Sequence, residues 1–258
     1  MTDVLRLLQI SDIHLFADRG RRTHGVCSYD SFTDVLNHVR ARHLADTDAL
    51  LLTGDLVNDE PAGYADLLAS LQPLAKPVFA IPGNHDSMAP MRAAFDNSQL
   101  QIGGHVDFTH WRVILLDSSV AGFDHGELSQ LELQRLQALV ASADRLHVLV
   151  ALHHHPVALA SAWIDPLGLR NASELFAITD RHPNVRAICW GHVHQAFDVR
   201  RNGVRLMSAP STCVQFKPLS EEFATDPIPP GYRRLMLHKD GTVGTEVIRI
   251  LSAAANSV

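Results

Sequence analysis

Six short apolar segments, each with the length and character of a buried β-strand, constrain this chain more than any other feature. They lie at Leu5–Ile10, Ala49–Thr53, Val78–Ile81, Val113–Leu116, Val148–Leu152 and Ala187–Trp190. Two segments between the first three, Phe32–Val39 and Tyr64–Leu71, have apolar residues spaced as on one face of an amphipathic helix. Because strands and helices alternate, the sequence predicts a layered α/β fold with a mainly parallel sheet.

The remaining sequence predicts two more helices and a C-terminal part of different character. Ser129 and Glu132 have the spacing of a capping box, and a further helix is expected near Asn171. Residues 217–230 are polar and rich in proline, which predicts a loop or flap over one end of the sheets. Three late strands, the last two joined by a hairpin signal at 239–241, predict a second sheet with antiparallel edges: Val204–Ala209, Tyr232–His238 and Thr242–Ile250.

Length and composition favour a single domain of residues 1–258. A hydrophobic content of 46% allows a chain of this size to bury a substantial core. No apolar stretch approaches the roughly 20 residues of a membrane helix and no leader precedes the first strand, so we expect a soluble, cytoplasmic protein without a membrane partner. The net charge of −6 argues against nucleic acid as a partner. Three widely spaced cysteines suggest neither a disulfide framework nor a cysteine zinc site.

Five of the expected strands are each followed at once by polar residues of types that can bind metals. Their sequences are Asp12-Ile13-His14, Gly54-Asp55, Gly83-Asn84-His85-Asp86, His153-His154-His155 and Gly191-His192-Val193-His194. Each cluster alone is inconclusive, because such residues are also common in polar loops and turns. The carboxyl ends of parallel strands share one edge of a sheet, however, so we expect the clusters to converge there. Carboxylates, neutral imidazoles and an amide oxygen suit Mn²⁺, Fe²⁺, Zn²⁺ or Co²⁺.

In this order the clusters resemble the calcineurin-like metallophosphoesterase superfamily, whose pattern is Asp-x-His, Gly-Asp, Gly-Asn-His-Asp or Glu, His and Gly-His-x-His. The resemblance implies a four-layer α/β/β/α sandwich of two mixed sheets flanked by helices. It also implies two divalent ions, Fe²⁺ and/or Mn²⁺, with Zn²⁺ or Co²⁺ as alternatives. One ion would be bound by Asp12, His14 and His194, and the other by Asn84, His153 and His192, with Asp55 bridging both. His153 ends its strand and best matches the family ligand, and His154 is the alternative.

A closer resemblance is to the bacterial class III 3',5'-cyclic-AMP phosphodiesterases. It extends over Gln9–Phe16, His125–Ser129 and Pro210–Pro218, and the last segment is the most informative because no metal chemistry demands it. The resemblance implies hydrolysis of 3',5'-cyclic AMP to 5'-AMP by a hydroxide that bridges the two ions. The partner would be this small phosphodiester, and a homodimer is compatible with the family. Base specificity would come from side chains of the flap and loops.

Within this chemistry, His85 is the candidate general acid or transition-state donor, because it adjoins the ligand Asn84 without being needed as a ligand. We expect Asp86 to orient it. The ordinary interpretation of His85 is a turn residue bonded to the backbone. Five residues are also expected to contact the substrate: His14, Asp55, Asn84, His85 and His194.

Three other functions fit parts of the pattern. A broader phosphodiesterase would act on glycerophosphodiesters or 2',3'-cyclic nucleotides. A non-catalytic metal-binding scaffold is disfavoured by the complete ligand set and by His85. A nuclease of similar fold is disfavoured by the acidic charge.

Overall fold

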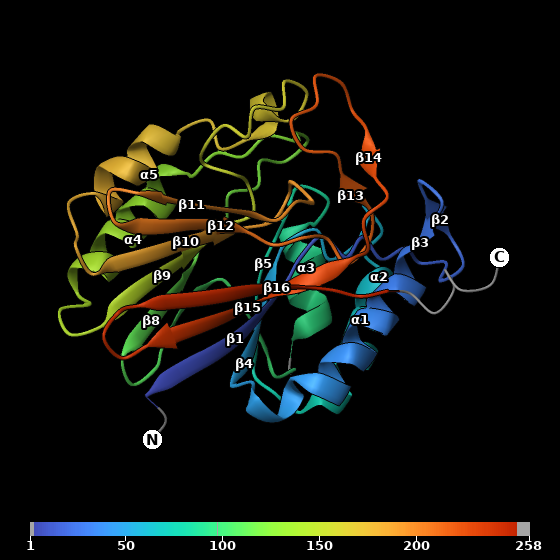
Figure 1. Cartoon of the computed structure of the whole chain (residues 1–258), viewed down its shortest axis with the longest axis horizontal. Coiled ribbons are helices and arrows are strands. Elements are labelled where there is room, and N and C mark those ends of the chain that lie inside the picture. Colours follow the sequence, from blue (N-terminus) through green and yellow to red (C-terminus); the bar gives the residue numbers. More distant parts are fainter. Residues whose placement is uncertain (1–2, 97, 252–258) are drawn as a thin grey trace.

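Two six-stranded mixed sheets form the centre of the computed structural model, which describes residues 3–96 and 98–251 (Figure 1). The first sheet has the order β16 (Val243–Arg249), β15 (Gly231–His238), β1 (Val4–Ile10), β4 (Ala49–Thr53), β5 (Val78–Ile81) and β6 (Leu100–Ile102). The second has the order β11 (Phe197–Arg201), β12 (Val204–Ser208), β10 (Val185–Trp190), β9 (His147–Ala151), β8 (Trp111–Leu115) and β7 (Gly104–Asp107). In the first sheet β1, β4, β5 and β6 pair in parallel, and β15 and β16 are antiparallel additions at one edge. In the second sheet β12, β10, β9 and β8 pair in parallel, and an antiparallel strand lies at each edge.

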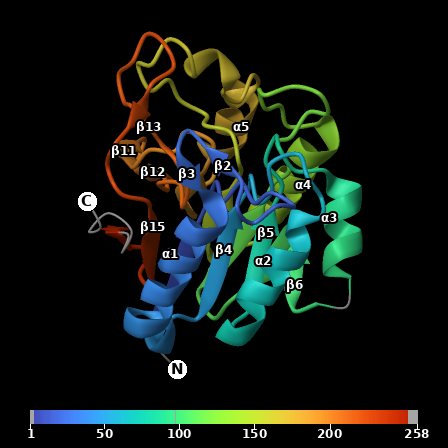
Figure 2. The same cartoon turned by 90° about the vertical axis from the view of Figure 1, so that its right-hand side faces the viewer.

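Helices cover the outer faces of the two sheets and complete four layers. The first sheet carries α1 (Ser28–Arg42), α2 (Gly63–Leu71) and α3 (Met88–Phe95), and the second carries α4 (Gln130–Ala141) and α5 (Ala172–Thr179). Figure 2 looks onto α1 and α2, with strands of the first sheet behind them. A third apolar cluster, which includes Leu7, Leu51, Val113 and Leu149, fills the space between the sheets. This arrangement confirms the predicted α/β/β/α sandwich.

Short elements join these layers. They are the 3₁₀ turns Leu44–Asp46, Gln72–Leu74 and Asp165–Leu167, the hairpin of β2 (Arg22–Thr23) and β3 (Val26–Cys27), and the hairpin of β13 (Gln215–Phe216) and β14 (Thr225–Asp226). The turn and the second strand of this hairpin lie in the predicted flap, residues 217–230, and β13 directly precedes it, so the flap has some regular structure. None of the helices in the described part of the chain is long and apolar enough to cross a membrane.

The local predictions are confirmed, with two corrections of topology. The six predicted strands are present, and the Ser129 hydroxyl accepts the Glu132 N–H at the start of α4. The late strands do not form one separate sheet, because β12 joins the second sheet whereas β15 and β16 extend the first sheet beside β1. The five polar clusters accordingly follow strands of two sheets and not of one.

Candidate metal centre

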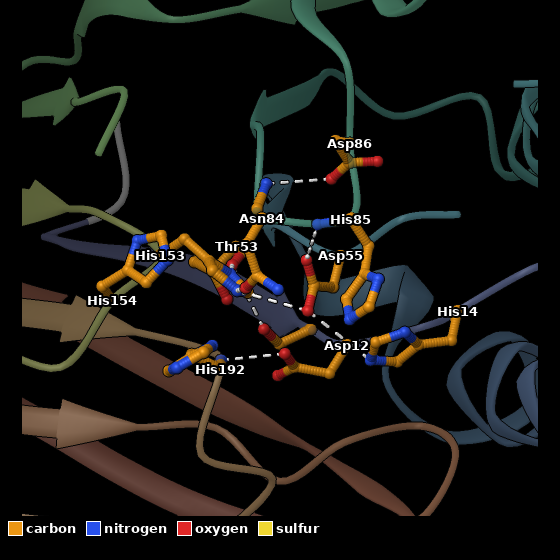
Figure 3. Close-up of polar contacts among 12 residues, drawn as sticks. Asp12, His14, Thr53, Asp55, Asn84, His85, Asp86, His153, His154 and His192 are labelled. Carbon is orange, nitrogen blue, oxygen red and sulfur yellow. Dashed lines mark hydrogen bonds and ion pairs between the residues drawn. The ribbon is translucent and has the colours of Figure 1, made fainter. Parts of the chain in front are cut away.

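The predicted polar clusters meet at one end of the two stacked sheets (Figure 3). The first sheet supplies the residues that follow β1, β4 and β5, and the second supplies those that follow β9 and β10. Two groups of side chains hold their ligand atoms within 4.8 Å of one another: Asp12, His14, Asp55 and His194 in one, and His153, His154 and His192 in the other. Stacking of the sheets thus brings together residues that are up to 182 positions apart, from Asp12 to His194.

Asp55 lies between the two groups. Its Oδ2 atom is 3.6 Å from His14 Nε2 and 3.3 Å from His153 Nε2. Asn84 Oδ1 lies 3.2 Å from the same nitrogen of His153, so the expected amide ligand faces the second group. All seven expected ligands are therefore close together, and their division between two ions stays a prediction.

His153 and its neighbour His154 are the two candidates for one ligand position. The Nδ1 atom of His153 is 2.7 Å from the Thr53 carbonyl oxygen, which leaves Nε2 directed toward Asn84 and Asp55. The Nδ1 atom of His154 is 2.9 Å from the Ser118 hydroxyl. The contact with Asp55 favours His153, which the family resemblance also implies. His154 stays the alternative, because its buried Nε2 atom has no hydrogen-bond partner among the described residues.

Several side chains have the protonation or the unused atoms that a cation site requires. His153 is the exception, because the Asp55 carboxylate outweighs burial and raises its pKa to about 9, so a cation would have to displace that proton. Asp12 Oδ2 and His192 Nε2 are buried and have no hydrogen-bond partner within the described ranges. Burial raises the pKa of Asp12 to about 7, and it holds the pKa values of His192 and His194 well below the usual range. Neutral imidazoles beside a desolvated carboxylate fit divalent cations, which would compensate the buried charge.

Backbone conformation aims these side chains into the site. Five candidate ligands have positive φ angles, which are uncommon for residues other than glycine: Asp12 (54°), His14 (52°), Asp55 (52°), His192 (67°) and His194 (48°). Hydrogen bonds between the loops hold this conformation, including that from the Asp12 N–H to the Gly54 carbonyl oxygen (3.0 Å). Such strain of about 1–3 kcal/mol per residue persists where the surrounding structure enforces it.

Gly54 is required where the loops after β4 and β9 approach. Its φ is +92°, and a Cβ atom at this position would lie 2.3 Å from His153 Nδ1. Any larger residue would therefore displace the imidazole that faces Asp55. In the sequence Gly54 can be interpreted as an ordinary turn residue. In the structure a residue without a side chain is needed there for the site to pack.

His85 has a carboxylate partner that sequence reasoning missed. Its Nδ1 atom lies 2.9 Å from Asp59 Oδ2, and its main-chain N–H donates to Asp55 Oδ1 (3.0 Å). Burial lowers the pKa of His85, but the carboxylates of Asp55 and Asp59 outweigh this and raise it overall. Asp59 follows Asp55 by four residues in a loop, and only that proximity could have drawn attention to it.

Asp86 does not orient His85, so the expected contact is wrong. Its carboxylate accepts the main-chain N–H groups of Gly83 (2.9 Å), Leu56 (3.1 Å) and Val57 (3.3 Å), and the Tyr64 hydroxyl (2.9 Å). Figure 3 shows this carboxylate directed away from the His85 ring. Asp86 therefore fastens the loop after β5 to the loop after β4.

We predict that Asp86→Ala lowers the free energy of unfolding by about 3 kcal/mol, because several buried N–H groups lose their acceptor. Urea denaturation of the variant and the wild type measures this change. Tyr64→Phe is the matched control and should cost about 1 kcal/mol, since it removes one hydrogen bond only. A loss below that of Tyr64→Phe would contradict the role assigned to Asp86.

Comparison with known proteins agrees with this geometry. Residues 5–196 match the calcineurin-like phosphoesterase family. The chain is 41% identical over 252 residues to the 3',5'-cyclic adenosine monophosphate phosphodiesterase CpdA of Vibrio vulnificus, covering 97% of this chain and 92% of that protein. It is 42% identical over 245 residues to the protein of the same name from Pseudomonas aeruginosa, covering 95% and 89%.

A solved structure with low sequence identity supports the same fold, and the fold alone. A dimetal phosphatase from Danio rerio superimposes with a TM-score of 0.67 at 16% identity, covering 96% of this chain and 99% of that one. The family match covers most of the chain and includes every predicted ligand, from Asp12 to His194. The chain belongs to the calcineurin-like phosphoesterase family.

Proposed function

We propose that this protein hydrolyses 3',5'-cyclic AMP to 5'-AMP with two bound divalent ions. The observation that carries the proposal is the meeting of seven Asp, His and Asn ligands beside His85, in a chain whose relatives with this activity in their name match over nearly its full length. The nitrogen and oxygen ligands support Fe²⁺ or Mn²⁺ as the ions, with Zn²⁺ or Co²⁺ as alternatives.

The ligands would divide as the sequence predicts. Asp12, His14 and His194 would hold one ion, Asn84, His153 and His192 would hold the other, and Asp55 would contact both. When bound, such ions would neutralise phosphate oxygens and lower the pKa of a nearby water molecule. The substrate phosphate would then lie against His14, Asp55, Asn84, His85 and His194.

The residues of the chain itself would control the departure of the 3' oxygen. A water molecule would release one proton to solvent and add as hydroxide to phosphorus while the bond between phosphorus and the 3' oxygen breaks. His85 would donate a proton to that oxygen and regain one from solvent. Asp59 would fix the ring through Nδ1, so that Nε2 is the atom that carries the transferred proton. This assignment yields the 5' monoester as product.

We predict that a chelator abolishes cyclic AMP hydrolysis and that added Mn²⁺ restores it. Chromatography of the product against 5'-AMP and 3'-AMP standards identifies which phosphorus–oxygen bond breaks. A product that is only 3'-AMP would overturn the proposed orientation. If metal-loaded protein turns over no cyclic nucleotide but cleaves glycerophosphodiesters well, the broader phosphodiesterase is the correct assignment.

A further inference from the structure

An aromatic cluster connects the candidate metal centre to the flap. The rings of His194 and Phe216 are stacked, with centroids 3.9 Å apart and planes 5° apart. Phe216 makes edge contacts with Trp163 (5.1 Å) and Phe223 (5.4 Å), and Phe223 also contacts Trp163 (5.1 Å). The His24 ring lies 5.0 Å from Phe223. We call Trp163, Phe216, Phe223 and His24 the flap cluster.

The members of the flap cluster come from three separate parts of the chain. Phe216 is in β13 and Phe223 lies between β13 and β14, whereas Trp163 is in the segment after β9. His24 is at the turn between β2 and β3, where it and Gly25 have positive φ angles of 46° and 83°. Figures 1 and 2 both show these two hairpins near each other at one end of the molecule. The cluster thus links the hairpins beside the metal centre.

Phe223 presents an aromatic ring to solvent at the outer end of this cluster. The residue is 45% exposed, whereas Phe216 and Trp163 are half-buried. One ring, Phe216, separates it from the ligand His194. An exposed aromatic ring held in place by other rings is a surface on which a flat heteroaromatic group can stack.

We propose that Phe223 is the platform on which the nucleobase of the substrate stacks. This inference rests on the proposed function, because it takes the phosphate to lie at the metal centre. The base is neutral and flat, and the ribose carries it away from the phosphate. Phe223 lies on such an outward path, since the aromatic contacts lead from His194 to the flap. Stacking would recognise the base without contributing to the reaction at phosphorus.

Phe123 is the rival platform, and its surroundings disfavour it. The residue is 55% exposed, and Phe123 and Phe223 are the two exposed phenylalanines among the described residues. The ring of Phe123 contacts His125, which is not a predicted metal ligand. Phe223 is instead joined to a predicted ligand through Phe216, so its position is coupled to that of the metal centre.

Kinetics of Phe223→Ala on two substrates test this inference. One is 3',5'-cyclic AMP and the other is methyl riboside 3',5'-cyclic phosphate, which has no base. We expect the KM for cyclic AMP to rise by about 10- to 100-fold with little change in kcat, because stacking binds substrate and transition state alike. The values for the baseless diester should stay near those of the wild type. Phe223→Trp should restore the preference for cyclic AMP.

Two matched variants serve as controls. Leu219→Ala changes another apolar residue of the flap, which is 74% exposed and outside the cluster, and Phe123→Ala removes the rival ring. Both should behave as the wild type on both substrates. A cyclic-AMP-specific loss in Phe123→Ala and not in Phe223→Ala would overturn the inference. An equal loss on both substrates in Phe223→Ala would also overturn it, because Phe223 would then only support His194.

Binding measurements separate this inference from the proposed function. Calorimetry on Mn²⁺-loaded protein compares 5'-AMP with ribose 5-phosphate and requires no turnover. We expect the wild type to bind 5'-AMP about 10- to 100-fold more tightly, and Phe223→Ala to lose that preference. An absence of cyclic AMP turnover with this preference intact would refute the proposed function alone. Equal binding of the two ligands to the wild type would refute the platform.

Discussion

Asp55→Ala should reduce turnover to background, a loss of roughly 10⁴-fold in kcat, while the protein remains folded. Asp55 is the one candidate ligand in the described chain whose carboxylate contacts His14 in one group and His153 in the other. In the proposed two-metal centre its removal would therefore take a ligand from both ions at once. Steady-state kinetics, elemental analysis and circular dichroism of the purified variant measure activity, metal content and folding.

His14→Ala is the matched variant for this experiment. His14 belongs to one group of ligand atoms, so its removal should lower the occupancy of one ion and leave the other bound. Near-wild-type activity of Asp55→Ala would refute a two-metal mechanism. Unchanged content of both metals in Asp55→Ala and in His14→Ala would refute the ligand assignment instead.

The layered α/β architecture and the convergence of the polar clusters could be predicted because both depend on local sequence patterns, whereas the assignment of ligands to ions comes from the family resemblance and stays a prediction. Each ligand cluster directly follows a recognisable apolar strand, as Asp55 follows Ala49–Thr53. The position of β15 could not be predicted in this way. Its antiparallel register with β1, which places Leu235 opposite Leu7, joins residues distant in sequence, and the strand pattern alone is compatible with either sheet.

The finer features of the site depend on backbone conformation that no local pattern reveals. Asp86 was expected to orient His85 because the two are adjacent, yet the loop directs their side chains differently. Asp59, which lies in the loop after β4 and has a positive φ of 60°, makes the contact with His85 that was expected of Asp86. The positive φ angles of Asp12 and His194 are likewise enforced by contacts between loops. Residue types were therefore predictable and their orientations were not.

His85→Ala should lower kcat for cyclic AMP by roughly 10²–10⁴-fold and leave the metal content unchanged. A ribose alkoxide is a poor leaving group, so it depends on a proton donor. The phenolate that leaves bis(p-nitrophenyl) phosphate is stable without protonation, and the same substitution should cost much less on this substrate. Parallel kinetics on the two diesters, with elemental analysis of the variant, measure this difference.

Asp59→Asn tests the orientation of the same ring without removing it. An amide can still accept a hydrogen bond from Nδ1, but it lacks the carboxylate charge that, together with the charge of Asp55, raises the pKa of His85. A smaller loss with the same dependence on leaving group is therefore expected. Equal losses on both diesters in His85→Ala would assign His85 to charge stabilisation or substrate positioning, which do not depend on leaving-group basicity. Loss of metal from His85→Ala would instead make it a support for the neighbouring ligand Asn84. Asp59→Asn keeps the imidazole in place. A general-acid role for His85 therefore predicts a loss of kcat that is large in His85→Ala, smaller in Asp59→Asn, and in both variants greater for cyclic AMP than for bis(p-nitrophenyl) phosphate.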